Sequence, residues 1–174
     1  MPASEKNVAV ELYSKNEEEF QQKVPFNVEA EQYVLGCIIN NNDYINRVAD
    51  FLLAEHFYEP LHRDIYEKIT SLYDNGTVVT PITLKNYFID NDAMLDAGGN
   101  NYLLVLSNKA TGVVGLKSYA KIVYNTFVAR RLIEIAEETI ENSRDVKGDE
   151  DASSQIEEPE NKLFSLASSG NIDT

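Results

Sequence analysis

The pattern of apolar and polar positions changes in kind about two thirds of the way along the chain. Between residues 25 and 107 the apolar positions come in short runs at helical spacing, separated by polar residues, glycine and proline. From about 117 to 142 there is no glycine or proline, and apolar residues recur in steps of three and four. The first pattern predicts several short helices, and the second predicts one long helix.

These patterns predict an all-α protein with no sheet. We expect a mobile acidic arm at 1–24, a compact head of orthogonal helices at 25–107, and a protruding helical hairpin at 108–168 within the same domain.

Capping residues mark where the helices of the head begin and end. Asn27 can accept hydrogen bonds from the first turn of a helix that ends near residue 39, and Asp43 or Asn42 can start the next. Asn75-Gly76 is typical of a left-handed helix stop, and Thr80-Pro81 of a helix start. A last short helix of the head is expected after Gly98-Gly99.

The long helix is apolar on more than one side, so we expect one side to pack within the chain and another to bind a partner. A heptad-like seam consists of Tyr119, Ile122, Thr126, Ala129, Ile133, Ala136 and Ile140. Four apolar residues lie off this seam: Val123, Phe127, Leu132 and Ile135. A second hairpin arm carries Leu163 and Phe164, and because proline is tolerated in the first turn, this arm should begin near Pro159 and be short.

Charge and cysteine content exclude several classes of protein. With 15 basic against 29 acidic residues and a formal charge of −14, the chain lacks the basic surface that direct binding of nucleic acid requires. A single cysteine, Cys37, rules out a disulfide framework and indicates a reducing compartment. No apolar run approaches the roughly 18 residues of a membrane span. We therefore expect a cytoplasmic protein without membrane contact.

No group of residues has the pattern of an active site, so we expect no catalytic residue, cofactor or metal in this chain. The phosphate-binding pattern Gly-x-x-x-x-Gly-Lys-Ser/Thr is absent. His56 and His62 stand six apart with Pro60 between them, a poor spacing for a metal site, and His62 is better explained as a packing residue. Glu29 and Glu31 suit the positive end of a helix dipole. A small enzyme built on the histidines and carboxylates at 55–64 stays as an alternative.

The order of short motifs resembles the N-terminal domain of DnaB-family replicative helicases, from about Pro25 to Ala167. The motifs are Pro25 to Gly36 (PFNVEAEQYVLG), Phe57-Tyr58 with His62, Ile65 and Tyr66, Gly76 with Thr83-Leu84, Gly98-Gly99 with Tyr102-Leu103 and Leu106, Tyr119-Ala120, Ile122-Val123, Arg130 to Ile133 (RRLI), and Leu163-Phe164 with Leu166-Ala167.

The resemblance implies a collar domain that pairs through its hairpins, with three pairs forming a ring on a hexameric ATPase motor. ATP and Mg would belong to that motor, which this chain lacks, and residues 169–174 would begin a linker toward it. Expected partners are a second copy of the chain, a DnaG-type primase bound at the outer hairpin and, as a further partner, a helicase loader. The expected pairing surface is Ile122, Val123, Thr126, Phe127, Ala129, Ile133, Ala136, Ile140, Leu163 and Phe164. The alternative is a stand-alone adaptor or decoy that binds a replicative helicase through the same fold.

Overall fold

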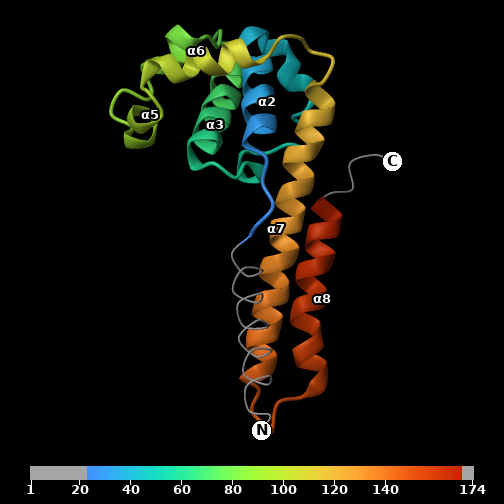
Figure 1. Cartoon of the computed structure of the whole chain (residues 1–174). Coiled ribbons are helices and arrows are strands. Elements are labelled where there is room, and N and C mark those ends of the chain that lie inside the picture. Colours follow the sequence, from blue (N-terminus) through green and yellow to red (C-terminus); the bar gives the residue numbers. More distant parts are fainter. Residues whose placement is uncertain (1–22, 170–174) are drawn as a thin grey trace, which may run out of the picture.

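The computed structural model describes residues 23–169, and all of its regular elements are helices. Most of the predicted arm and all but the first residue of the predicted linker therefore lie outside the described residues. A head of short helices sits at one end of a long two-helix hairpin (Figure 1). In chain order the elements are α2 (Val28–Asn40), η1 (Asn42–Arg47), η2 (Ala54–His56), α3 (Pro60–Asp74), α4 (Pro81–Lys85), α5 (Asp92–Asp96), α6 (Asn100–Lys109), α7 (Leu116–Arg144) and α8 (Ala152–Ser169).

Helix α2 is the centre of the head. Asn27 caps it as predicted, since its side-chain oxygen accepts a hydrogen bond of 2.9 Å from the backbone N–H of Ala30. Eight of its thirteen residues are buried, because α3, α6 and the first turns of α7 pack around it. At Gly36 the backbone of α6 comes so close that a Cβ atom would lie 2.0 Å from the carbonyl oxygen of Leu106.

The core of the head continues into the long helix. Leu116, Ala120 and Val123 of α7 are at most 1% exposed and belong to the same buried cluster as α2 and α3. The predicted boundary between residues 107 and 108 therefore falls inside the packing of the head. Only the part of α7 beyond about Arg130 protrudes as a hairpin arm.

Most of the predicted helix ends are confirmed. Gly76 follows α3 with a positive φ of 72°, and the side chain of Thr80 accepts from the backbone N–H of Thr83 at the start of α4. The element predicted after Asn40-Asn41-Asn42 is a 3-10 helix capped by Asn41 rather than an α-helix. The short elements η2 and α5 were not predicted, because each is only three to five residues long and shows no apolar period.

The second hairpin arm is longer than predicted. Helix α8 begins at Ala152, where the Asp151 carboxylate accepts a hydrogen bond from the Ser153 hydroxyl, and Pro159 lies inside the helix. The prediction that the arm begins at Pro159 was wrong, because α8 runs for seven residues ahead of the proline and continues after it, although proline cannot donate one backbone hydrogen bond of the helix. No helix within residues 23–169 is both long and apolar enough to cross a membrane.

Candidate partner-binding surface

Arg130 joins the root of the hairpin to the head. Its guanidinium donates to the backbone oxygen of Pro25 at 2.9 Å and to that of His56 at 3.0 Å, and it lies 5.3 Å from the ring centre of Tyr58. The side chain is only 9% exposed, and burial is the main influence that lowers its pKa. Arg130 thus ties the segment before α2 and the η2 turn to one point on α7. The sequence showed it only as part of the RRLI motif and gave no sign of its contacts with the head.

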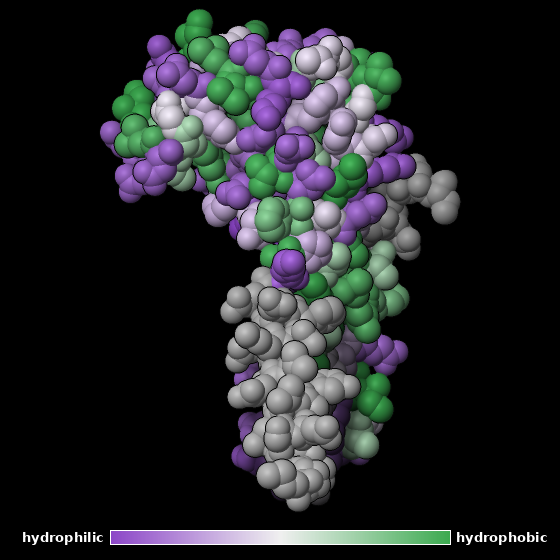
Figure 2. Space-filling model, in the orientation of Figure 1, coloured by the Kyte–Doolittle hydropathy of each residue, from purple (hydrophilic) through white to green (hydrophobic). Residues whose placement is uncertain are grey.

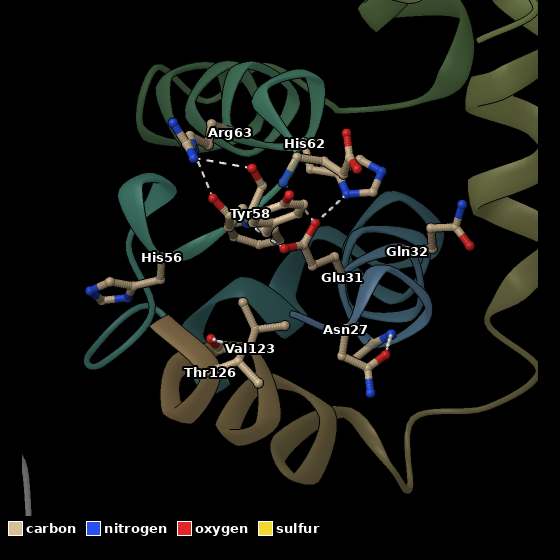
Figure 3. Close-up of polar contacts among 12 residues, drawn as sticks. Asn27, Glu31, Gln32, His56, Tyr58, His62, Arg63, Val123 and Thr126 are labelled. Carbon is tan, nitrogen blue, oxygen red and sulfur yellow. Dashed lines mark hydrogen bonds and ion pairs between the residues drawn. The ribbon is translucent and has the colours of Figure 1, made fainter. Parts of the chain in front are cut away.

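A buried carboxylate, Glu31, connects α2 to the start of α3. Glu31 Oε2 lies 2.6 Å from His62 Nδ1, and the Glu31 carboxylate also accepts from the backbone N–H groups of Tyr58 and Glu59 ahead of α3 (Figure 3). His62 Nε2 lies 2.6 Å from the hydroxyl of Tyr102 on α6. Glu31 therefore does more than favour the helix dipole: it joins α2 to the start of α3, and His62 extends the connection to α6.

The two histidines do not form a common site. In Figure 3 the His56 ring points away from His62. The backbone N–H of Leu53 donates to His56 Nδ1 at 2.9 Å, and the ring packs 4.5 Å from that of Phe127. Burial, assisted by the nearby Arg130 charge, lowers the pKa of His56 to about 4.

Neither group of polar residues has the features of an active site. The His62 ring is 1% exposed, so a substrate cannot reach it. Burial raises the pKa of the Cys37 thiol, which opposes a nucleophilic role. Among residues 23–169, no three His, Cys, Asp or Glu side chains gather to hold a metal ion. The structure thus gives no support to a small enzyme built on residues 55–64.

The distal hairpin is the part of the described chain with the least internal burial. From Ala136 to Ser169 no residue is buried. Large apolar side chains nevertheless project from both arms, with exposures of 45% for Leu132, 51% for Ile140, 63% for Ile156, 45% for Leu163 and 71% for Phe164. Figure 2 shows apolar residues along one flank of the hairpin. Exposed apolar area of this kind is typical of a surface that binds a protein.

The structure divides the ten residues of the expected pairing surface into two groups. Ile140, Leu163 and Phe164 project from the hairpin, Ala136 is exposed, and Ala129, Ile133 and Thr126 are half-buried on α7. Val123 was placed on this surface wrongly, because it is 1% exposed in the core of the head. Ile122 packs against that core and Phe127 against His56, so both serve the protomer first.

Charge also distinguishes the distal hairpin. Between residues 134 and 160 there are eleven carboxylates and two basic residues, a net charge of −9 out of −14 for the whole chain. Lys162 bridges the arms, with its Nζ 2.6 Å from Glu138 and 2.8 Å from Glu158. The surface that the hairpin offers is therefore apolar along one flank and acidic toward its tip.

The sequence and the fold of this chain are similar to those of known proteins. The family model described as "DnaB-like helicase N terminal domain" matches residues 23–125. The "Replicative DNA helicase DnaB" of Rickettsia conorii is 39% identical over 147 residues, which are 84% of this chain and 30% of the relative. That of Haemophilus influenzae is 32% identical over 143 residues, 82% of this chain and 30% of the relative. The chain thus spans about 30% of the length of these relatives.

Two solved structures have a similar fold. The first is the N-terminal domain of DnaB helicase from Mycobacterium tuberculosis. The matched region covers 82% of this chain and 99% of the chain in that structure, with a TM-score of 0.73 and 24% sequence identity. The second is a DnaB-like replicative helicase, described together with its interactions with primase. Here the matched region covers 80% of this chain and 31% of the chain in that structure, with a TM-score of 0.63 and 26% sequence identity. The first confirms the all-α head and hairpin as a known arrangement.

Proposed function

Because the chain belongs to the DnaB-like helicase N-terminal domain family, we propose that it is the collar domain of a hexameric replicative DNA helicase. In this role it pairs with a second copy through the hairpin, and three pairs form a ring on the motor. ATP and Mg act in the motor region of the full-length protein. The domain itself contributes assembly and recruitment of partners rather than chemistry.

The observation that carries the proposal is the unburied apolar flank of the hairpin. Leu163 and Phe164 on α8 and Ile140 on α7 expose about half or more of their side-chain surface, while α8 has no buried residue. The hairpin protrudes from a well-packed head and leaves apolar area exposed. We expect a partner to cover this apolar area in the assembled protein. In a two-fold dimer the same apolar flank of a second hairpin packs against it, so that each copy buries the exposed residues of the other.

Light scattering over a concentration series tests the pairing. The unmodified chain should approach twice its monomer mass of 19.6 kDa as concentration rises. Phe164→Asp should hold it at the monomer mass, because a buried unpaired carboxylate opposes association. Ile82→Asp is the matched control, since Ile82 on α4 of the head is exposed to the same 71%. A dimer that survives Phe164→Asp but not Ile82→Asp would contradict pairing through the hairpin, provided that circular dichroism shows both variants folded.

We propose that a DnaG-type primase binds the outer hairpin, the stretch between residues 134 and 160 that has a net charge of −9. We propose a helicase loader as a further partner. One solved structure with this fold is a DnaB-like replicative helicase that is described together with its interactions with primase. Calorimetric titration of the chain with a DnaG-type primase tests the first contact. Glu157→Lys on α8 should weaken binding, and Glu67→Lys on the exposed side of α3 should leave it unchanged. Equal effects of both variants would contradict a contact at the hairpin.

A further inference from the structure

The helical state of α8 receives little support from the protomer. None of the 34 residues from Ala136 to Ser169 is buried, whereas eight of the thirteen residues of α2 are. Helices in water gain most of their stability from packing an apolar face, and even sequences with high helix propensity are marginal alone at about 15 residues. Helix α8 has 18 residues and a mean helix propensity well below that of such sequences.

The contacts that hold α8 against α7 are also weak. Pro159, Lys162 and Leu166 recur on the side facing α7, and each is only partly covered. The ion pairs of Lys162 with Glu138 and Glu158 lie at the surface, with the two carboxylates more than half exposed. Exposed pairs of this kind contribute little to stability.

Pro159 weakens the helix further. It is the eighth residue of α8, so the carbonyl of Gln155 four residues earlier has no backbone N–H to accept from. The turn that joins Gln155 to Pro159 therefore lacks one backbone hydrogen bond of the helix. The apolar residues that could compensate, Ile156 and Leu163, stand seven apart on a face that α7 leaves exposed, and Phe164 lies next to them.

We propose that the folding of α8 is coupled to pairing with a second copy of the chain, so that α8 is largely unfolded in the monomer and helical in the dimer. This inference rests on the proposed function. The second hairpin covers Ile156, Leu163 and Phe164 and so supplies the burial that α8 lacks. The cost of ordering α8 is then part of the dimer dissociation constant, and any change that stabilises the helix alone tightens the dimer.

Pro159→Ala separates coupled folding from a preformed helix. Alanine restores the backbone donor and is the best helix former, so coupled folding predicts a dissociation constant lower by at least about tenfold. If α8 is already helical in the monomer, the substitution stabilises both states equally and leaves the constant unchanged. Glu67→Ala is the control, since Glu67 is an exposed position of α3 in the head and is helical in both states. It should leave the constant unchanged.

Hydrogen exchange of the unmodified chain, followed by mass spectrometry alongside light scattering, gives an independent readout. The amides of α8 should exchange almost as fast as an unfolded peptide at monomer concentrations and slow down as the dimer forms. The amides of α2 should be protected throughout. A dimer with equal α8 protection at all concentrations overturns coupled folding and leaves the proposed pairing intact. A monomer at every concentration overturns the proposed pairing, and this inference with it.

Discussion

Glu31 Oε2 and His62 Nδ1 lie 2.6 Å apart inside the head, with both side chains at most 2% exposed. Because the same carboxylate accepts from the backbone N–H groups of Tyr58 and Glu59, it joins α2 to the start of α3. This contact explains why a glutamate stands on the buried side of a helix that is otherwise apolar there.

Replacing Glu31 by alanine should therefore cost far more than a lost surface charge. Glu31→Ala leaves two backbone donors and the His62 ring without their partner, so the free energy of unfolding should fall by about 3–5 kcal/mol. Glu29→Ala, two residues earlier and exposed, should cost less than about 1 kcal/mol. Urea denaturation of both variants measures the difference. Similar losses would show that Glu31 acts only on the helix dipole.

Arg130 should be sensitive even to replacement by lysine. Lysine has the charge but not the planar fork that reaches the backbone oxygens of Pro25 and His56 together, so Arg130→Lys should lower the free energy of unfolding by about 2 kcal/mol. The neighbouring Arg131 makes a surface pair with Glu134, and Arg131→Lys should cost less than about 0.5 kcal/mol. Thermal and urea unfolding check both values, and equal losses would remove the special role of Arg130.

The close approach of α2 and α6 makes Gly36 intolerant of a side chain. Because an added Cβ would lie 2.0 Å from the Leu106 carbonyl oxygen, Gly36→Ala must push the two helices apart. We expect a loss of about 2–3 kcal/mol in the free energy of unfolding. Gly112→Ala is the control, since nothing lies within 4 Å of the Cβ it would add. A neutral Gly36→Ala would contradict the tight packing of these helices.

Stability should depend on pH through His56. Its pKa is about 4 in the folded head and 6.5 as an ordinary histidine, so between these values the unfolded chain binds a proton that the folded chain does not. Stability is therefore lost as pH falls from about 6.5 to about 4, by on the order of 2 kcal/mol from this group. His56→Gln should flatten that part of the urea-derived stability profile. An unchanged slope would show that His56 is not the group responsible.

Local signals in the sequence predicted much of the head. The Asn27 cap, the Gly76 stop and the Thr80-Pro81 start each depend on residues within a few positions, and each is confirmed. The role of Glu31 could not be predicted, because its partners lie 27 to 31 residues away and meet it only after α3 has packed on α2. A glutamate at a buried helical position was the signal that could have indicated it.

The candidate site was harder to predict for a related reason. The period of α7 showed that two sides are apolar, but only the packed head reveals that Val123 is internal and that Phe127 contacts His56. On α8, the spacing of Leu163 and Phe164 identified them as apolar residues on one side of a helix. The start at Ala152 could not be predicted, because the sequence pattern placed Pro159 in the first turn.

A distance measured between the two copies shows whether they meet through their hairpins. Cys37 is buried, so a spin label can be placed at a single new surface cysteine per chain. Double electron–electron resonance would compare Asn161→Cys on α8 with Asn86→Cys after α4. If the hairpins pair, we expect a shorter and narrower distance distribution for the label at position 161. A shorter distance between labels at position 86 would place the contact on the heads and contradict pairing through the hairpins.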